Sequence, residues 1–109
     1  MSFPNDLGCV YLHGFLSSPL STKAQELTRY FRDHKIAEQL RVPCLSFEPS
    51  EAIEQAKSAV ESLQQQEGIN DVFVIGSSLG GYYATYLSQT MGIKAALINP
   101  AVKPFELFD

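Results

Sequence analysis

The segment GSSLG at residues 76–80 holds the residue types best suited to chemistry in this chain. It matches the pattern G-x-S-x-G, with Ser78 at the centre, and lies between the apolar run VFVI and a segment with helical spacing. In a strand-turn-helix setting the central residue projects from a sharp, strained bend, and the flanking Gly76 and Gly80 avoid clashes with neighbouring backbone. The pattern therefore predicts that Ser78 is a nucleophile and Ser77 a small spacer.

Two backbone amides are candidates for an oxyanion hole beside Ser78. The helix that follows the serine begins at once, so the N-H of Leu79 lies at the positive end of that helix. The first apolar run ends in the glycine-containing turn LHGF, and the carboxyl ends of parallel strands meet at one edge of a sheet. The N-H of Phe15 is therefore predicted as the second donor, in a turn supported by His13 and Gly14.

Two other functions have less support in the sequence: catalysis by one of the histidines, and nucleotide binding by the glycine-rich turn. A histidine at the end of a buried strand, such as His13, is more often a hydrogen-bonded structural group than a base, and His34 is expected at the surface. A phosphate-binding P-loop requires Gly-Lys-Ser/Thr, but residues 72–91 contain no lysine. The glycines at 76, 80 and 81 also lack the G-x-G-x-x-G spacing of a dinucleotide site.

Composition narrows the class of protein. A chain of 109 residues with 45% hydrophobic residues is long enough for one folded domain. A net charge of -4 and scattered Lys and Arg argue against nucleic-acid binding, and neither a membrane span nor a signal peptide is recognisable, which favours a cytoplasmic protein. Cys9 and Cys44 are expected as reduced core residues, and the histidines lack the spacing of a metal site.

Apolar runs and helical patterns alternate along the chain. The second run is expected as a short edge strand because Pro43 has no N-H to donate. Such alternation predicts a parallel sheet with helices on both faces. The expected strands lie at 8–14, 40–47, 71–76 and 93–99, and the expected helices at 19–33, from Ser50 to the region of Gly68, and at 79–91.

Three segments of this chain carry a resemblance to a known family. They are YLHGFLSSPLSTKA at 11–24, VIGSSLGGYYATYL at 74–87 and LINPAVKPFELF at 97–108. The chain resembles the amino-terminal part of an α/β-hydrolase, and within that superfamily the small bacterial YqiA-like esterases. The resemblance implies a three-layer α/β sandwich with strand order 2-1-3-4. It also implies hydrolysis of small acyl esters or thioesters through an acyl-enzyme on serine, without metal or organic cofactor.

The chain departs from that family in one respect. Family members continue well past this point, and their acid and histidine follow the serine in the chain. No histidine follows Ser78 here, so the triad acid and base are predicted to be absent and residues 1–109 to form a truncated, single α/β-hydrolase-like domain. The alternative is a noncatalytic protein that uses the same fold for binding or interaction.

The truncation also predicts an exposed sheet edge. Stopping after the fourth strand leaves the outer side of residues 95–99 unpaired, and such edges pair readily with other strands. Self-association through this strand is therefore expected, unless residues 103–109 fold back over it. Phe15, Leu16, Tyr82 and Tyr83 are candidates for lining an acyl pocket, although core packing is the expected role for at least two of them.

Overall fold

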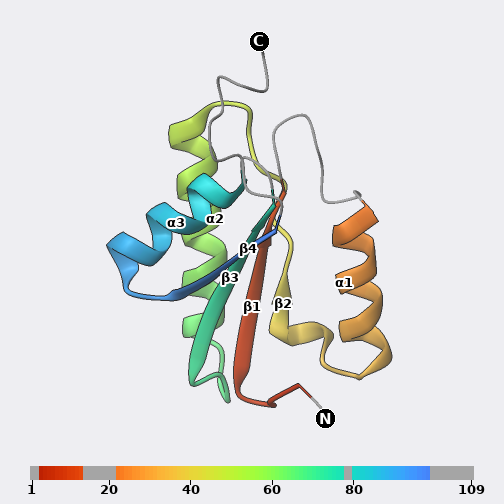
Figure 1. The fold of residues 1–109 in the computed structure, drawn as a ribbon. Helices are drawn as coiled ribbons and strands as arrows, with labels where there is room; N and C mark the ends of the chain where they lie inside the picture. The colour runs from red at the N-terminus through yellow and green to blue at the C-terminus, as the bar shows by residue number, and fades with distance from the viewer. Residues whose placement is uncertain (1–2, 14–21, 78–79, 99–109) are drawn as a thin grey trace.

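The computed structural model describes residues 3–13, 22–77 and 80–98 of the chain. Strands and helices alternate, as the sequence predicts (Figure 1). Helix α1 lies on one side of the sheet, and α2 and α3 lie on the other. In chain order the elements are β1 (Leu7–Leu12), α1 (Thr22–Asp33), the 3-10 helix η1 (Ala37–Gln39), β2 (Leu40–Arg41), α2 (Pro49–Gln64), β3 (Asp71–Ser77), α3 (Gly80–Met91) and β4 (Lys94–Ile98).

The strands form one parallel sheet in the order β2-β1-β3-β4. This order confirms the prediction from the family resemblance. In the register of the sheet, Leu12 at the end of β1 pairs with Gly76 of β3, and Gly76 pairs with Leu97 of β4. The carboxyl ends of three strands therefore meet at one edge, and the segments that bear the predicted site residues follow β1 and β3 there.

The two faces of the sheet carry separate apolar clusters. On one face, Val10 and Val74 pack with α2 residues such as Val60 and with Leu87 of α3. On the other face, Cys9 packs with residues of α1 and the η1 segment, and the half-buried side chains of β3 extend this cluster. Alternate residues of a strand point to opposite faces, so both clusters follow from the strand pattern. The predicted three-layer sandwich is confirmed.

Helix α2 begins differently from the prediction. The sequence suggested Ser50 as its first cap, but Glu48 is the N-cap, and its side chain accepts hydrogen bonds from the backbone N-H groups of Ser50 and Glu51. Pro49 occupies the first helical position, where its fixed φ is favourable and its missing N-H costs nothing. The prediction failed because a glutamate side chain is long enough to fold back and replace the usual serine.

Strand β2 is shorter than the predicted run at 40–47. Only Leu40 and Arg41 pair with β1, and residues 42–48 continue as a loop toward α2. Pro43 lies in this loop, consistent with its inability to donate a ladder hydrogen bond. Cys44 also lies there and is exposed, so its expected place in the core is wrong, whereas Cys9 is buried as expected.

Helices α1 and α3 end and begin close to the predicted positions. The predicted cap at residues 18–19 lies outside the described residues, and the described part of α1 starts at Thr22. Gly92 follows α3 with φ of 71°, a left-handed conformation that glycine adopts without steric cost. Its N-H donates to the carbonyl of Ser88, so Gly92 closes the helix as predicted.

Candidate active site

The candidate site lies where β3 turns into α3. Gly76 lies in β3 directly beneath the first turns of α3, and a Cβ atom placed on it would lie 2.5 Å from the carbonyl oxygen of Gly80 and 2.7 Å from the Cα of Gly81. Contacts this short to backbone atoms cannot be relieved by a side-chain movement. A larger residue at position 76 would therefore push the helix away from the strand from which it emerges.

Gly80 holds the same turn against the neighbouring strand. A Cβ atom on Gly80 would collide with the carbonyl oxygen of Leu12 and would lie 2.8 Å from that of His13. The start of α3 thus packs directly on the carboxyl end of β1. Both glycines of the G-x-S-x-G pattern are accounted for by close approach of backbone to backbone, as the sequence predicts for a sharp strand-to-helix turn.

Ser78 and Leu79 join the last residue of β3 to the first residue of α3, and they lie outside the described residues. Gly14 and Phe15, which follow β1, lie outside them as well. The described parts of the two turns are thus Gly76, Ser77 and Gly80 on one strand and His13 on the other. The nucleophile and both oxyanion donors stay predictions from the sequence.

The first turn of α3 favours negative charge near this edge. Its N-terminal amides have no partners within the helix, and its first turn contains no acidic residue. The partial positive charge of these amides is therefore not compensated by a carboxylate of the helix itself. Such a helix start can stabilise an anion that develops beside it, which is the requirement for acyl transfer to a serine.

His13 is buried and already holds a hydrogen bond. Its side chain is 6% exposed, and its Nε2 accepts from the backbone N-H of Leu45 at 2.9 Å. A nitrogen that accepts a hydrogen bond carries no proton, so its lone pair is directed at Leu45 and not at a substrate or a serine. His13 therefore ties the end of β1 to the loop at 42–48, in keeping with the structural role favoured by its position in the sequence.

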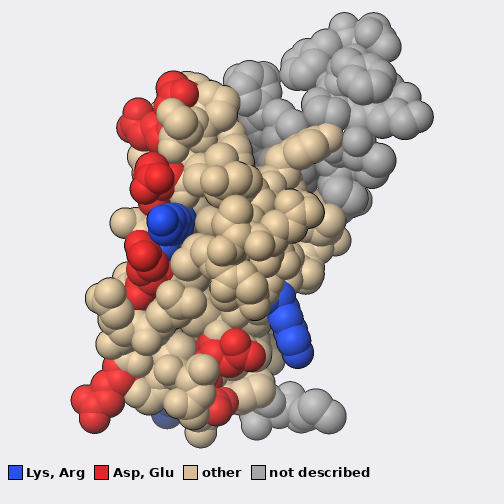
Figure 2. All heavy atoms as spheres, turned by 90° about the vertical axis from the view of Figure 1, so that its left-hand side faces the viewer, with Lys and Arg blue, Asp and Glu red and all other residues tan. Residues whose placement is uncertain are grey.

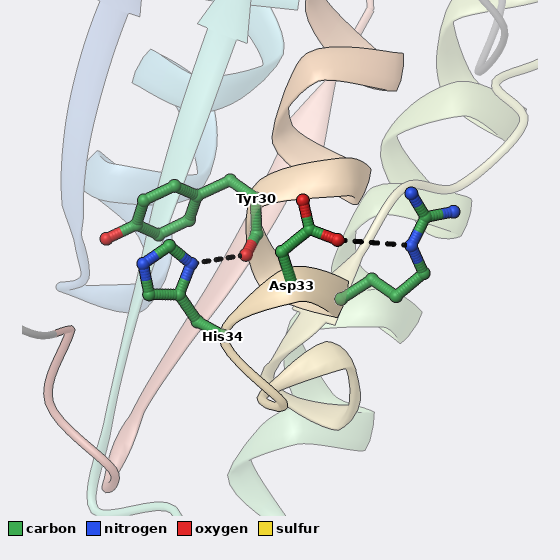
Figure 3. Close-up of polar contacts among 4 residues, drawn as sticks. Tyr30, Asp33 and His34 are labelled. Atoms are coloured by element: carbon green, nitrogen blue, oxygen red, sulfur yellow. Dashed lines mark hydrogen bonds and ion pairs between the residues drawn. The ribbon is translucent and has the colours of Figure 1, made fainter.

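His34 lies far from this edge. Helix α1 runs antiparallel to the strands, so its last residue, Asp33, lies near their amino-terminal ends, and His34 follows it (Figure 1). The imidazole stacks on the ring of Tyr30 with centroids 4.0 Å apart, and its Nδ1 lies 2.8 Å from the carbonyl oxygen of Tyr30 (Figure 3). Next to it, Asp33 pairs with Arg32 at 3.6 Å. Neither described histidine is placed to act as a base at the serine turn.

The loop at 42–48 is a part of the site edge that the sequence did not reveal. Besides the contact with His13, the N-H of Ser46 donates to Oε1 of Gln55 on α2, at 2.7 Å. The loop is thus fixed to both β1 and α2. No motif marks it, because its role depends on contacts between residues far apart in the chain.

Tyr83 joins α3 to the start of α2. Its side chain packs against the core, and burial, followed by the negative charge of Glu48, raises the pKa of its hydroxyl. The pKa of Glu48 itself is lowered, first by the hydrogen bond from the Ser50 hydroxyl and then by the backbone N-H groups that it caps. The Tyr83 hydroxyl therefore keeps its proton and stays a donor, while Glu48 stays ionised. Of the predicted pocket residues, Tyr82 is exposed and Tyr83 is half-buried.

The described residues contain no group of His, Cys, Asp or Glu side chains suited to hold a metal ion. Within the same ranges, no helix has the length and apolar character needed to cross a membrane.

Comparison with known proteins shows the family to which this chain belongs. The protein family described as "Uncharacterised protein family (UPF0227)" matches residues 8–109. The chain belongs to this family. A UPF0227 protein of Shewanella sediminis (strain HAW-EB3) is 30% identical over 99 residues, which make up 89% of this chain and 52% of that relative. The chain thus spans about half the length of the curated UPF0227 relative that it matches.

A solved structure shares the fold. It comes from work described as "LipS and LipT, two metagenome-derived lipolytic enzymes increase the diversity of known lipase and esterase families". The superposition has a TM-score of 0.69 and 21% sequence identity, and covers 90% of this chain and 43% of the other. At this identity the likeness concerns the fold. This UPF0227 chain therefore has the architecture of the amino-terminal part of an α/β-hydrolase, as the resemblance predicted.

Proposed function

We propose that this UPF0227 chain is the nucleophile-bearing part of a serine esterase or thioesterase. Ser78 is the nucleophile, and the backbone N-H groups of Leu79 and Phe15 form the oxyanion hole. The substrate is a small acyl ester or thioester, and neither a metal nor an organic cofactor takes part. The observation that carries the proposal is the glycine packing of the β3–α3 turn against β1.

That packing supports the proposal because it meets the steric requirement of a nucleophile turn. Only Ser78 and Leu79 connect β3 to a helix that returns over Gly76, so the chain must reverse direction within a very short segment. The contact of Gly80 with Leu12 then brings the start of α3 against the end of β1, which Gly14 and Phe15 follow in the chain. The fold match to a lipolytic enzyme is consistent with the same chemistry.

In the proposed reaction, Oγ of Ser78 attacks the acyl carbonyl carbon, and the carbonyl oxygen becomes an oxyanion that accepts hydrogen bonds from the two amides. A base takes the serine proton and passes it to the leaving alcohol or thiol as the bond between carbonyl carbon and leaving group breaks. Water then hydrolyses the acyl-enzyme. The lone pair of His13 is engaged by Leu45, and His34 lies at the other end of the sheet. The base in this reaction must therefore be a group other than these two imidazoles.

Labelling with a fluorophosphonate tests the nucleophile directly, because this reagent phosphonylates activated serines irreversibly. Intact-mass analysis and peptide mapping of the labelled chain should place one adduct on Ser78. Ser78→Ala should abolish the adduct, whereas the matched control Ser77→Ala should retain it. An adduct on any other serine, or none on a chain whose circular dichroism shows it folded, would argue against the assignment.

A noncatalytic binding role is the second candidate, and one observation favours it. Nε2 of His13 is held by the backbone N-H of Leu45, and His34 lies at the other end of the sheet, so neither imidazole of the described residues is placed for proton transfer at the serine turn. General-base help is worth roughly 10²- to 10⁴-fold in rate. If this role is correct, short-chain p-nitrophenyl esters should bind without Ser78-dependent turnover, and Ser78→Ala should leave binding unchanged. A cytoplasmic location remains part of the proposal in either case.

A further inference from the structure

Two buried polar side chains lie near opposite ends of strand β1. Among the described residues, the buried polar side chains are those of His13 and Gln39, which are 6% and 3% exposed. The amide of Gln39 donates to the carbonyl oxygens of Pro4 and Leu7, both at 2.8 Å, near the start of the strand. His13 directly follows the last residue of the strand, at the edge that carries the serine turn. Because a buried polar group needs a hydrogen-bond partner, each side chain fixes the segment to which it bonds.

The hydrogen bond from Leu45 fixes both the proton and the direction of the His13 ring. A backbone N-H can only donate, so Nε2 is the acceptor in the 2.9 Å contact. With its lone pair at Nε2, the neutral ring carries its proton on Nδ1. Leu45 is itself buried and packs in the same apolar cluster as Leu12. Neither end of this bond can therefore turn away without disturbing the core.

From Leu45 the contacts continue along the loop at 42–48 to helix α2. The N-H of Ser46 donates to Gln55 Oε1 at 2.7 Å, and the Ser46 hydroxyl accepts from the N-H of Glu48 at 3.1 Å. Glu48 is in turn the N-cap of α2. The backbone N-H groups of residues 45, 46 and 48 thus each donate to a side chain. These bonds hold a segment without regular secondary structure in one conformation.

The contacts return to β1 through helix α3. Helices α2 and α3 share the apolar cluster on one face of the sheet, and the charge of Glu48, after burial, raises the pKa of the Tyr83 hydroxyl on α3. Gly80, the first residue of α3, lies against His13, since a Cβ atom on it would be 2.8 Å from the His13 carbonyl oxygen. His13 therefore meets α3 through its backbone and the loop through its side chain. The contacts form a closed ring at the edge that carries the serine turn.

This ring of contacts is built mainly from neutral groups. Figure 2 shows acidic side chains gathered along one border of the helical face, with a broad uncharged area beside them. Gln55, which holds the loop, is partly buried. All the charged residues of α2 are exposed, namely Glu51, Glu54, Lys57 and Glu61. Apart from the Glu48 cap, the ring thus depends on the placement of uncharged donors and acceptors.

We propose that His13 is a positioning residue for the serine site. Its Nε2 holds the loop at 42–48 against the carboxyl end of β1, and this bond keeps the end of β1 and the start of α3 in the arrangement that acyl transfer to Ser78 requires. The inference rests on the proposed esterase function, because it assigns His13 a part in that reaction. The imidazole does not take the serine proton, since Leu45 occupies its lone pair. A displacement of about 1 Å at a reacting group can cost about a hundredfold in rate, so loss of this bond should be measurable.

The rate at which a fluorophosphonate labels Ser78 measures this role. His13→Leu removes the acceptor and should slow labelling by about tenfold or more. His13→Gln should retain most of the native rate, because its Oε1 lies near the place of Nε2 and can accept the same bond. Gln39→Leu is the matched control, since it removes a similarly buried polar side chain at the other end of β1. It should lower stability and leave the labelling rate of the folded chain unchanged.

Gln55→Met opens the same ring from α2 and serves as a second test if His13→Leu does not fold. The side chain of Gln55 is only partly buried, so the fold should tolerate this change. Ser46 then loses its acceptor, and labelling should slow less than in His13→Leu because the bond to Leu45 remains. Equal rates in the native chain and in the folded variants at positions 13 and 55 would overturn the proposal. An equal slowing in Gln39→Leu would overturn it too.

Nuclear magnetic resonance separates the positioning role from the proposed esterase chemistry. In the native chain, a scalar coupling across the hydrogen bond should join the Leu45 amide to Nε2, and Nε2 should have the chemical shift of an unprotonated ring nitrogen. The amide signals of Gly80 and Gly81 should move in His13→Leu and return toward their native positions in His13→Gln. If the native chain resists labelling, the esterase proposal fails and these signals alone decide the positioning role. Signals at positions 80 and 81 that do not respond to His13→Leu would overturn it.

Discussion

Strands β1 and β4 run parallel in the same sheet and have similar apolar sequences, yet their surroundings differ completely. Residues 9–12 of β1 are at most 1% exposed, whereas four of the five residues of β4 are exposed. Strand β1 has a neighbour on both edges and helices over both faces, while β4 has one neighbour among the described strands. An apolar pattern thus predicts a strand, but the burial of that strand depends on what the rest of the fold places around it.

The largest expected difference between β1 and β4 is in the reactivity of a cysteine thiol placed on each strand. Burial raises the pKa of Cys9 on β1 to about 12, so its thiolate is about a thousandfold scarcer than that of an ordinary cysteine. In the native chain Ellman's reagent should titrate Cys44 and leave Cys9 unreacted until denaturant is added. A cysteine introduced on β4 by Ala95→Cys should react at a rate close to that of Cys44. Rapid reaction of Cys9 without unfolding would contradict the burial of β1.

Shortening one leucine in each strand should show the same difference between β1 and β4 in the free energy of unfolding. Leu12 ends β1 fully buried, and Leu97 lies next to the end of β4 half-exposed. Leu12→Ala should lower the free energy of unfolding by about 3 kcal/mol, because it removes a packed side chain and leaves a cavity. Leu97→Ala should cost less than about 1 kcal/mol. Urea denaturation of dilute protein measures both, and equal losses would show that β4 is buried after all.

Two glycines at opposite ends of α3 extend the comparison to the helix. Gly80 touches the backbone of β1, whereas a Cβ on Gly92, next to β4, would meet nothing within 4 Å. Gly80→Ala should destabilise the chain by about 2–3 kcal/mol through steric overlap with carbonyl oxygens. Gly92→Ala should cost about 1 kcal/mol, the strain of a left-handed backbone alone. Thermal and urea unfolding should rank the variants in this order, and the reverse order would contradict the packing of α3 on β1.

The smallest effect concerns pH and the start of α2, which covers β1. The pKa of Glu48 is lowered in the folded chain, so the ionised cap stabilises the fold above the ordinary glutamate pKa. This contribution should be lost as the pH falls through the folded pKa. The difference in unfolding free energy between the native chain and Glu48→Gln should therefore shrink from about pH 7 toward about pH 3. Ser58→Ala, on the exposed side of the same helix, removes no titrating group and should show no such trend.

Much of the architecture was predictable because it depends on local signals. Alternating apolar runs and helical stripes predicted the strands and helices, and Gly76 and Gly80 predicted the close turn between β3 and α3. The cap of α2 by Glu48 was missed because serine is the commoner capping residue and also stands nearby. The exposure of Cys44 was missed because Pro43 ends the pairing of β2 earlier than the apolar run suggests.

The candidate site was less predictable than the fold. Its glycines follow from a motif, but the contact of His13 with Leu45 joins residues that are 32 positions apart. No local pattern announces such a contact, because it arises only when β1 and the loop at 42–48 meet in the folded chain. The same limitation applies to the influence of Glu48 on Tyr83, which depends on two helices that start at the same edge.

The closed edge at β2 also limits how far strand pairing can proceed. A sheet that is adhesive on both sides can recruit copies without end and grow into a fibril. Because Arg41 and Pro43 discourage pairing on the β2 side, copies of the described sheet cannot add to one another through that border. Growth of a fibril needs a free border on both sides of the sheet, so the turbidity of concentrated protein should stay low.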